Sequence, residues 1–316
     1  MLYLLLYALS DTKLEICVKK MKNKKRSGSP LSQCKYSFSV QNKGVGITVG
    51  CRKCIVCRLQ HVDQWTTRLC LESEKYTNSL FLTLTYTNEH LPETLKQEDL
   101  QKFIKRLRRK YSDMKCKYYA CGEYGDNFQR PHYHIIFFTD YLFELKLFKQ
   151  RPDNKNLYIS EQIQERWGLG YVTIGKVNTE TIKYVASYSM KKLIKKSDYN
   201  GQVPEFQLVS LGMAKDFAEA NQEYIRKYNN VLVKTDKGII RKPVPQYMRK
   251  KAGIISICDK SFSEKYDYRQ EKEDKFYQKV SYFNRKGFSH YHSQDMIYTS
   301  LETRAKKSCI KTSENI

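Results

Sequence analysis

Residues 130–138 read RPHYHIIFF, and this stretch decides the fold. Two histidines separated by one residue run into four apolar side chains of β-branched and aromatic type, which is typical of a buried strand. Because side chains alternate across a strand, His132 and His134 share one face at a separation of roughly 7 Å. Two imidazoles so placed can hold one divalent ion. The other interpretation is that they are ordinary polar residues of a half-exposed strand.

The composition points to a polyanionic partner. Lys and Arg number 57 against 33 Asp and Glu, which gives a net charge of +24 over 316 residues. Proteins this basic favour nucleic acid, because neutralising phosphates releases counterions. Tyrosine is also abundant, with 25 residues, and single-stranded nucleic acid stacks on aromatic rings that alternate with cations.

The ten cysteines are too sparse for a disulfide scaffold. Cys51, Cys54 and Cys57 are spaced as metal ligands often are, which favours a reducing compartment, and with Cys34 or Cys70 they could bind structural zinc. Buried reduced thiols are the alternative. The apolar N-terminus, MLYLLLYALS, is too short to span a bilayer, so we expect no membrane association.

Hydrophobic periodicity predicts an α+β domain with a central, mainly antiparallel sheet flanked by helices. We expect helices at 58–76, 96–111, 160–168, 180–195 and 215–228, strands at 80–85, 117–122, 131–138 and 170–177, and a hairpin at 231–241. A loop and one short strand are expected at 34–49, and a loop at 140–158. The predicted organisation is an N-terminal arm (1–33), one domain (34–250) and a C-terminal extension (251–316) that forms a charged helix and a loose tail.

The helix predicted at 96–111 carries acidic residues early and basic residues late, which complements the helix dipole. Its outer face is therefore basic and suits phosphate binding. The candidate nucleic-acid-binding residues are Arg106, Arg108, Arg109 and, ahead of the histidine strand, Arg130.

The connection GEYGDNFQR at 122–130 is rich in turn residues, so the strand that ends near Glu123 should neighbour the histidine strand. Glu123 thereby becomes a third candidate ligand. Imidazole together with a hard carboxylate suits Mg or Mn, and Mn more than Mg. A second H-x-H pair, His290 and His292, lies in a polar stretch and is the weaker candidate.

Tyr184 and Tyr188 lie one turn apart on the helix predicted at 180–195, with Lys191 and Lys192 beside them. We expect both rings to project away from the apolar side of the helix. Phenols near ammonium groups can attack a phosphate, because the cations stabilise both the phenolate and the transition state. The alternative is a pair of structural tyrosines at a helix edge.

Together these residues predict metal-assisted transesterification, in which a tyrosine attacks a phosphodiester and keeps the bond energy in a covalent link. A second tyrosine allows a second transfer. The competing hypothesis is a non-enzymatic, zinc-containing, basic nucleic-acid-binding protein.

The segments FLTLTY, HLP, GEYG, RPHYHIIFF and YVASYSMKK, in this order and spacing, closely resemble the HUH endonucleases that start rolling-circle replication. The resemblance is to the replication initiation proteins of microviruses, which are small single-stranded DNA bacteriophages, and to their gokushovirus branch. It extends to CRKCIVCR and SLGMAKDF, and so covers about residues 34–250.

The resemblance implies an HUH fold of ferredoxin-like or RRM-like type, a metal held by His132, His134 and Glu123, and alternating nucleophiles at Tyr184 and Tyr188. The implied substrate is single-stranded or supercoiled DNA at a replication origin in the host bacterial cytoplasm. Nicking would leave a 5′-phosphotyrosyl link and a free 3′-OH, which the host helicase and polymerase would use.

One position departs from the family pattern. Related proteins often carry Lys just before the second tyrosine, where this chain has Ser187. Lys183, Lys191 or Lys192 would then have to supply the positive charge.

Overall fold

The computed structural model describes residues 34, 38–42, 45–125, 128–151, 155–188, 201–236, 238–254 and 268–314. The predicted arm at 1–33 lies outside these residues, and its prediction stands untested. Among the described helices, none combines the length and apolar character that a membrane crossing requires.

A seven-stranded sheet with the order β6-β7-β8-β3-β5-β4-β9 forms the centre of the fold, and all of its strand pairs are antiparallel. Its strands are β3 (Asn78–Leu84), β4 (Cys116–Tyr124), β5 (Pro131–Thr139), β6 (Lys146–Lys149), β7 (Leu157–Ile159), β8 (Val172–Lys176) and β9 (Phe206–Val209). The histidine strand β5 lies between β3 and β4. This confirms the predicted α+β class with an antiparallel sheet, and the arrangement is consistent with the HUH endonuclease fold.

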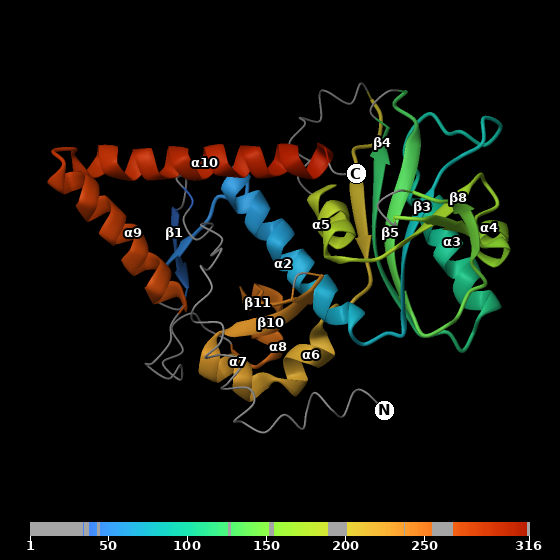
Figure 1. Ribbon diagram of the computed structural model, residues 1–316, viewed down its shortest axis with the longest axis horizontal. Coiled ribbons are helices and arrows are strands. Elements are labelled where there is room, and N and C mark those ends of the chain that lie inside the picture. Colours follow the sequence, from blue (N-terminus) through green and yellow to red (C-terminus); the bar gives the residue numbers. More distant parts are fainter. Residues whose placement is uncertain are drawn as a thin grey trace. The chain divides into compact units, whose positions relative to one another are not determined.

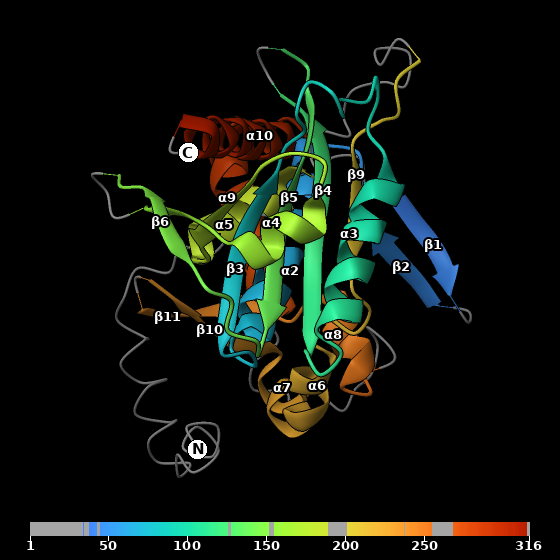
Figure 2. The ribbon, with the colours of Figure 1, turned by 90° about the vertical axis from the view of Figure 1, so that its right-hand side faces the viewer.

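Helices cover both faces of the sheet (Figures 1 and 2). On one face lie α3 (Gln97–Lys110) and α4 (Glu161–Trp167), and on the other lie α2 (Ile55–Ser73) and α5 (Thr179–Ser187). Alternation along the strands assigns side chains to these two layers. Tyr133 and Ile135 of β5 pack in the α3–α4 layer, and Ile136 packs in the α2–α5 layer. The candidate histidines belong to the same set of alternate positions as Ile136.

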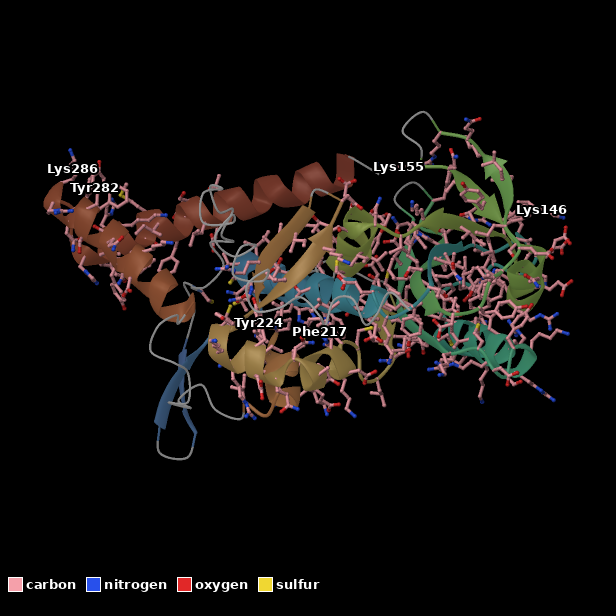
Figure 3. The ribbon with its side chains drawn as sticks, turned by 60° about the horizontal axis from the view of Figure 1, so that its bottom comes forward. Lys146, Lys155, Phe217, Tyr224, Tyr282 and Lys286 are labelled. Carbon is pink, nitrogen blue, oxygen red and sulfur yellow. The ribbon has the colours of Figure 1, made fainter. Side chains whose placement is uncertain are left out.

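The α2–α5 layer continues into a further group of elements: α6 (Lys215–Ala220), α7 (Gln222–Tyr228), β10 (Asn230–Thr235), β11 (Gly238–Pro243) and α8 (Gln246–Lys251). The strands β10 and β11 form the predicted hairpin. Phe217 of α6 packs against the core of this layer, and the Tyr224 hydroxyl of α7 donates to Asn230 Oδ1 at 3.1 Å (Figure 3).

The helix that carries the tyrosines has a well-defined start. Asn178 Oδ1 accepts from the Thr181 N–H at 2.8 Å, and Thr181 Oγ1 accepts from the Asn178 N–H at 2.9 Å. These reciprocal bonds satisfy two amide groups that would otherwise lack partners, and they fix the direction in which α5 leaves β8.

Four sequence predictions need correction. Residues 140–158 are not only loop, because β6 and β7 form an edge hairpin, and β6 is exposed throughout, so no apolar periodicity marked it. The helix predicted at 215–228 is broken at Asn221 into α6 and α7. Two strands, β1 (Phe38–Asn42) and β2 (Val45–Val49), stand where one was expected.

The fourth correction concerns the C-terminal extension, which is more ordered than expected. It forms two helices, α9 (Tyr268–Arg285) and α10 (His290–Glu314), in place of one helix and a loose tail. A small core of Phe276, Val280, Ile297 and Leu301 packs together with Val56 of α2, which explains why the charged sequence still forms paired helices. The predicted boundary near residue 250 stays a prediction.

Gly170 provides a test of the packing between β3 and β8. A Cβ at this position would lie 2.6 Å from Tyr86 Cα and 2.7 Å from Thr87 N, both of them backbone atoms that cannot move aside. We expect Gly170→Ala to lower the free energy of unfolding by about 2 kcal/mol or more, measured by denaturant titration. Gly125→Ala is the matched control, because its nearest neighbours lie at 3.7 Å and beyond. Equal stability of the two variants would contradict the close approach.

Candidate active site

Strand register brings the candidate ligands together. In the β4–β5 ladder Glu123 is directly opposite His132, and Cys121 is opposite His134. Because residues opposite each other share a face, Glu123 and both histidines point to the side of the sheet that α5 covers. The hairpin connection predicted from GEYGDNFQR therefore places the carboxylate where the sequence indicated.

The three side chains converge on one oxygen atom. His132 Nε2 lies 2.7 Å and His134 Nε2 lies 3.1 Å from Glu123 Oε1. The ring centroids of the two histidines are 5.0 Å apart, closer than the roughly 7 Å expected for an ideal strand, and the rings are perpendicular. Their side chains are 16% and 10% exposed, and that of Glu123 is 6% exposed. The site is thus shielded but open at one side.

The donor set fits a divalent cation. His132 Nδ1 lies 3.1 Å from the Arg130 carbonyl oxygen, which can only accept, so Nδ1 carries a proton. In a neutral imidazole the lone pair of Nε2 then faces the Glu123 carboxylate. Either a second proton or a cation must lie between these two acceptors. Each of the three residues offers a ligand atom within 4.8 Å of the others, so they can form a metal-binding group.

Electrostatics agree with this arrangement. Burial disfavours the charged form of Glu123, but hydrogen bonds with His132 and His134 outweigh it and hold the pKa of the carboxyl well below its usual range. The carboxylate is therefore ionised across the physiological pH range and available to a cation.

Sequence reasoning missed two residues around His134. The Thr83 hydroxyl of β3 lies 3.1 Å from His134 Nδ1, which holds the ring with Nε2 directed at Glu123. The ring of Phe81, two positions earlier on the same face, stacks on His134 at 5.4 Å. Alternation in FLTLTY could have placed both residues on this face, but only the pairing of β3 with β5 shows which histidine they meet.

The tyrosines lie against the histidines, and not at an outer edge as expected. The centroid of the Tyr184 ring is 5.7 Å, and that of Tyr188 5.4 Å, from the ring of His134, while the two tyrosine rings are 4.7 Å apart. Tyr188 is buried and Tyr184 half-buried. The expectation that both rings project away from the core was wrong, because α5 turns this side toward the strand that carries His134.

The Tyr188 phenol is strongly biased toward its protonated form. Burial raises its pKa well above the usual range, and the negative charge of Glu123 and the neighbouring Tyr184 add to the effect. A cation near Glu123 would oppose the second of these causes.

The lysines predicted to assist the tyrosines are only partly visible. Lys191 and Lys192 lie outside the described residues, so their role stays a prediction. Lys183 lies in α5 and is exposed. The Ser187 hydroxyl donates to the Tyr184 carbonyl oxygen at 2.6 Å, so this side chain is tied to its own helix.

Two of the arginines predicted to bind nucleic acid have contacts within the chain. Arg106 donates to the carbonyl oxygens of Arg166 and Trp167 at 2.6 and 2.8 Å, and so ties α3 to the end of α4. Arg130 donates to Asn88 Oδ1 at 2.8 Å. The other two side chains, Arg108 and Arg109, are exposed on α3. DNA contact by these four arginines stays a prediction.

The remaining candidates separate clearly. Cys51, Cys54 and Cys57 gather with Cys34, whereas Cys70 belongs to the core of the α2–α5 layer. The exposed His290 lies within hydrogen-bond distance of Gln294, and the ring of His292 stacks on that of Phe288. Neither of these histidines belongs to a metal-binding group among the described residues.

An antiparallel sheet with an H-x-H strand at its centre and a tyrosine pair packed against it is the arrangement that the HUH class predicts. A family model for replication-associated proteins of the ORF2 type matches residues 79–193, which span β3 to α5 and every ligand and tyrosine discussed above. No solved structure matches the chain.

Three curated relatives carry corresponding names. The chain is 36% identical over 251 residues to "Replication-associated protein ORF2" of Spiroplasma virus 4, which covers 74% of this chain and 76% of the relative. It is 36% identical over 156 residues to "Replication-associated protein VP4" of Bdellovibrio phage phiMH2K, with coverage of 47% and 50%. It is 33% identical over 165 residues to "Replication-associated protein ORF4" of Chlamydia phage 1, with coverage of 49% and 41%.

The chain therefore belongs to the family of phage replication-associated proteins of the ORF2 type. The resemblance found in its sequence motifs is confirmed at this level.

Thr83 tests the candidate metal group without touching a ligand. Thr83→Val keeps the size of the side chain and removes the oxygen beside His134 Nδ1. Because such outer partners orient metal-binding histidines, we expect the affinity for Mn²⁺ to fall about 10-fold or more, measured by isothermal titration calorimetry. Thr173→Val is the control, since Thr173 is opposite Thr83 on the other neighbouring strand, β8. Unchanged affinity in Thr83→Val would refute the role of Thr83.

Proposed function

We propose that this replication-associated protein is a metal-dependent, site-specific single-strand DNA endonuclease and strand transferase that initiates rolling-circle replication. The observation that carries the proposal is the position of Tyr184 and Tyr188. Both rings lie within 5.7 Å of His134, a member of the only His-containing metal-binding group among the described residues.

The residues that would hold the ion are His132, His134 and Glu123. A divalent ion bound there, Mg²⁺ or Mn²⁺, supplies positive charge to the scissile phosphate. Imidazole donors favour Mn²⁺ over Mg²⁺. The shielded position of the group supports this role, because electrostatic stabilisation is stronger where water is excluded.

The tyrosines perform the transfer. A phenol oxygen attacks phosphorus and forms a Tyr–O–P bond, and the bond from phosphorus to the 3′ oxygen of the preceding nucleotide breaks. The phenol gives up one proton and the departing 3′ oxygen takes up one. A 5′-phosphotyrosyl link and a free 3′-OH result. The reverse attack by a 3′-OH reseals the strand, because the phosphodiester energy is kept in the link.

Two adjacent phenols support repeated transfer. With their rings 4.7 Å apart, Tyr184 and Tyr188 reach the same phosphate position from one helix. One can hold a strand while the other attacks the next origin. Exposed Lys183 on the same helix, with Lys191 and Lys192, are the proposed sources of positive charge for the DNA backbone and the transition state.

The partners follow from the charge and the product. A net charge of +24 supports binding to single-stranded or supercoiled origin DNA. The free 3′-OH is a primer for a host polymerase, working with a host helicase in the bacterial cytoplasm.

A covalent adduct assay tests the proposal. Labelled single-stranded oligonucleotides that tile the phage genome are incubated with the protein and Mn²⁺, then separated under denaturing conditions. We expect one oligonucleotide to yield an adduct whose link is to tyrosine. The double variant Tyr184→Phe/Tyr188→Phe should form none, because no phenol remains at the site. Tyr171→Phe is the matched control, since Tyr171 is 65% exposed and lies before β8.

His132→Ala tests the ligand group in the same assay. Loss of the adduct with retention of DNA binding supports the ligand role of His132. An adduct that survives the double tyrosine substitution contradicts the assignment of the nucleophiles. A wild-type protein that binds DNA and never forms an adduct would favour a non-enzymatic DNA-binding protein.

A further inference from the structure

Four cysteines gather away from the candidate active site. Cys34 precedes β1, Cys51 and Cys54 flank the turn that leads into α2, and Cys57 lies in the first turn of α2. One ligand atom from each lies within 4.8 Å of all the others. Cys34 and Cys57 are buried, at 5% and 7% exposure.

We propose that these four thiolates bind one structural zinc ion. In a tetrahedral site with Zn–S bonds of about 2.3 Å, the sulfur atoms lie about 3.8 Å apart. The Sγ atoms of Cys34 and Cys54 are 3.6 Å apart, and the whole group fits within 4.8 Å. The same distance is too long for a disulfide, which needs about 2.05 Å.

The distances also discriminate between metals. The spacing Cys51-x2-Cys54-x2-Cys57 occurs in iron–sulfur proteins, so the sequence alone does not separate a zinc site from a cluster. In a four-iron cluster each cysteine binds a different iron, which holds the cysteine sulfurs well apart. A group as tight as this one has room for a single ion.

The backbone around the sulfurs is arranged as it is around thiolate ligands. The Cys51 N–H donates to Cys34 Sγ at 3.4 Å, and the N–H groups of Lys53 and Cys54 donate to Cys51 Sγ at 3.4 and 3.3 Å. Such bonds favour charged sulfur over thiol. They require a tight turn, in which Arg52 has a φ of 60°.

Gly50 is a second and independent indication. A Cβ at this position would lie 2.8 Å from Cys57 Sγ, so the backbone passes directly against the sulfur group. Only glycine permits this approach. The chain thus wraps around the sulfurs from both sides of the turn.

Charge balance supports zinc as well. Four thiolates and one Zn²⁺ carry a net charge of about −2, which needs nearby positive charge. The group lies at the N-terminus of α2, where the helix dipole is positive, and α2 has neither an acidic residue in its first turn nor a side-chain cap. Arg52, Lys53 and Arg58 follow within the same segment, and Arg58 Nε donates to the Lys53 carbonyl oxygen at 2.8 Å.

The position of the site indicates its role. Zinc would tie the chain before β1 to the start of α2, where Val56 packs with the apolar residues of α9 and α10. In a reducing compartment no disulfide is available for this purpose, and metal binding contributes directly to folding. Cys70 is excluded as a ligand because it packs in the core of the α2–α5 layer.

The test measures metal in the full-length protein, purified without chelators. Elemental analysis should find one zinc and no iron bound to a variant with His132→Ala and His134→Ala, in which the histidine site cannot contribute. Titration with a mercurial should release that zinc to a chromogenic indicator. Cys34→Ser should lose it to a chelator that leaves the parent protein loaded, whereas Cys70→Ser should keep it.

Cobalt keeps the inference testable if a cysteine variant does not fold. Co²⁺ bound to the otherwise wild-type chain should give intense near-ultraviolet thiolate-to-metal absorption and the visible bands of a tetrahedral site. Iron with brown colour, an absence of metal, or full zinc retention in Cys34→Ser would each overturn the four-thiolate zinc site. None of these readouts depends on DNA cleavage, so the proposed function can fail while the zinc site stands.

Discussion

The contact of two imidazoles with one carboxylate oxygen is the interaction on which the rest of the structure depends. Glu123 Oε1 receives His132 at 2.7 Å and His134 at 3.1 Å from a neighbouring strand, deep in the sheet. A buried carboxylate without partners would be unfavourable by several kcal/mol or would bind a proton. The register of β4 and β5 removes that penalty, and it also places both histidines beneath the tyrosine helix.

The surroundings of this group favour order over exposure. His134 is flanked by the rings of Phe81 and Tyr188 and is held at Nδ1 by Thr83. These neighbours come from two different elements, β3 and α5, so the orientation of a single imidazole reflects the packing of one whole layer. The capping box at Asn178 adds to this, because it sets where α5 begins relative to β8.

Much of this could be predicted from the sequence, for physical reasons. Turn residues between Glu123 and His132 implied a hairpin, and the two-residue period of a strand then implied a shared face. The side on which Tyr184 and Tyr188 lie could not be deduced, because both sides of α5 are partly apolar and only tertiary packing selects between them. Cys34 as the fourth thiol was equally hidden, since Cys70 is nearer in sequence to the cluster and differs only in which face of α2 it occupies.

The hairpin of β6 and β7 has a consequence for solubility. As an edge strand, β6 presents a row of backbone groups that could pair with another sheet. It spans only four residues, shifts register against β7, and carries Lys146 and Lys149, with Lys146 in an ion pair with Glu161 (Figure 3). An antiparallel copy of the same strand would place lysines near one another. The open edge of the sheet is thereby protected against self-association by its own short, charged strand.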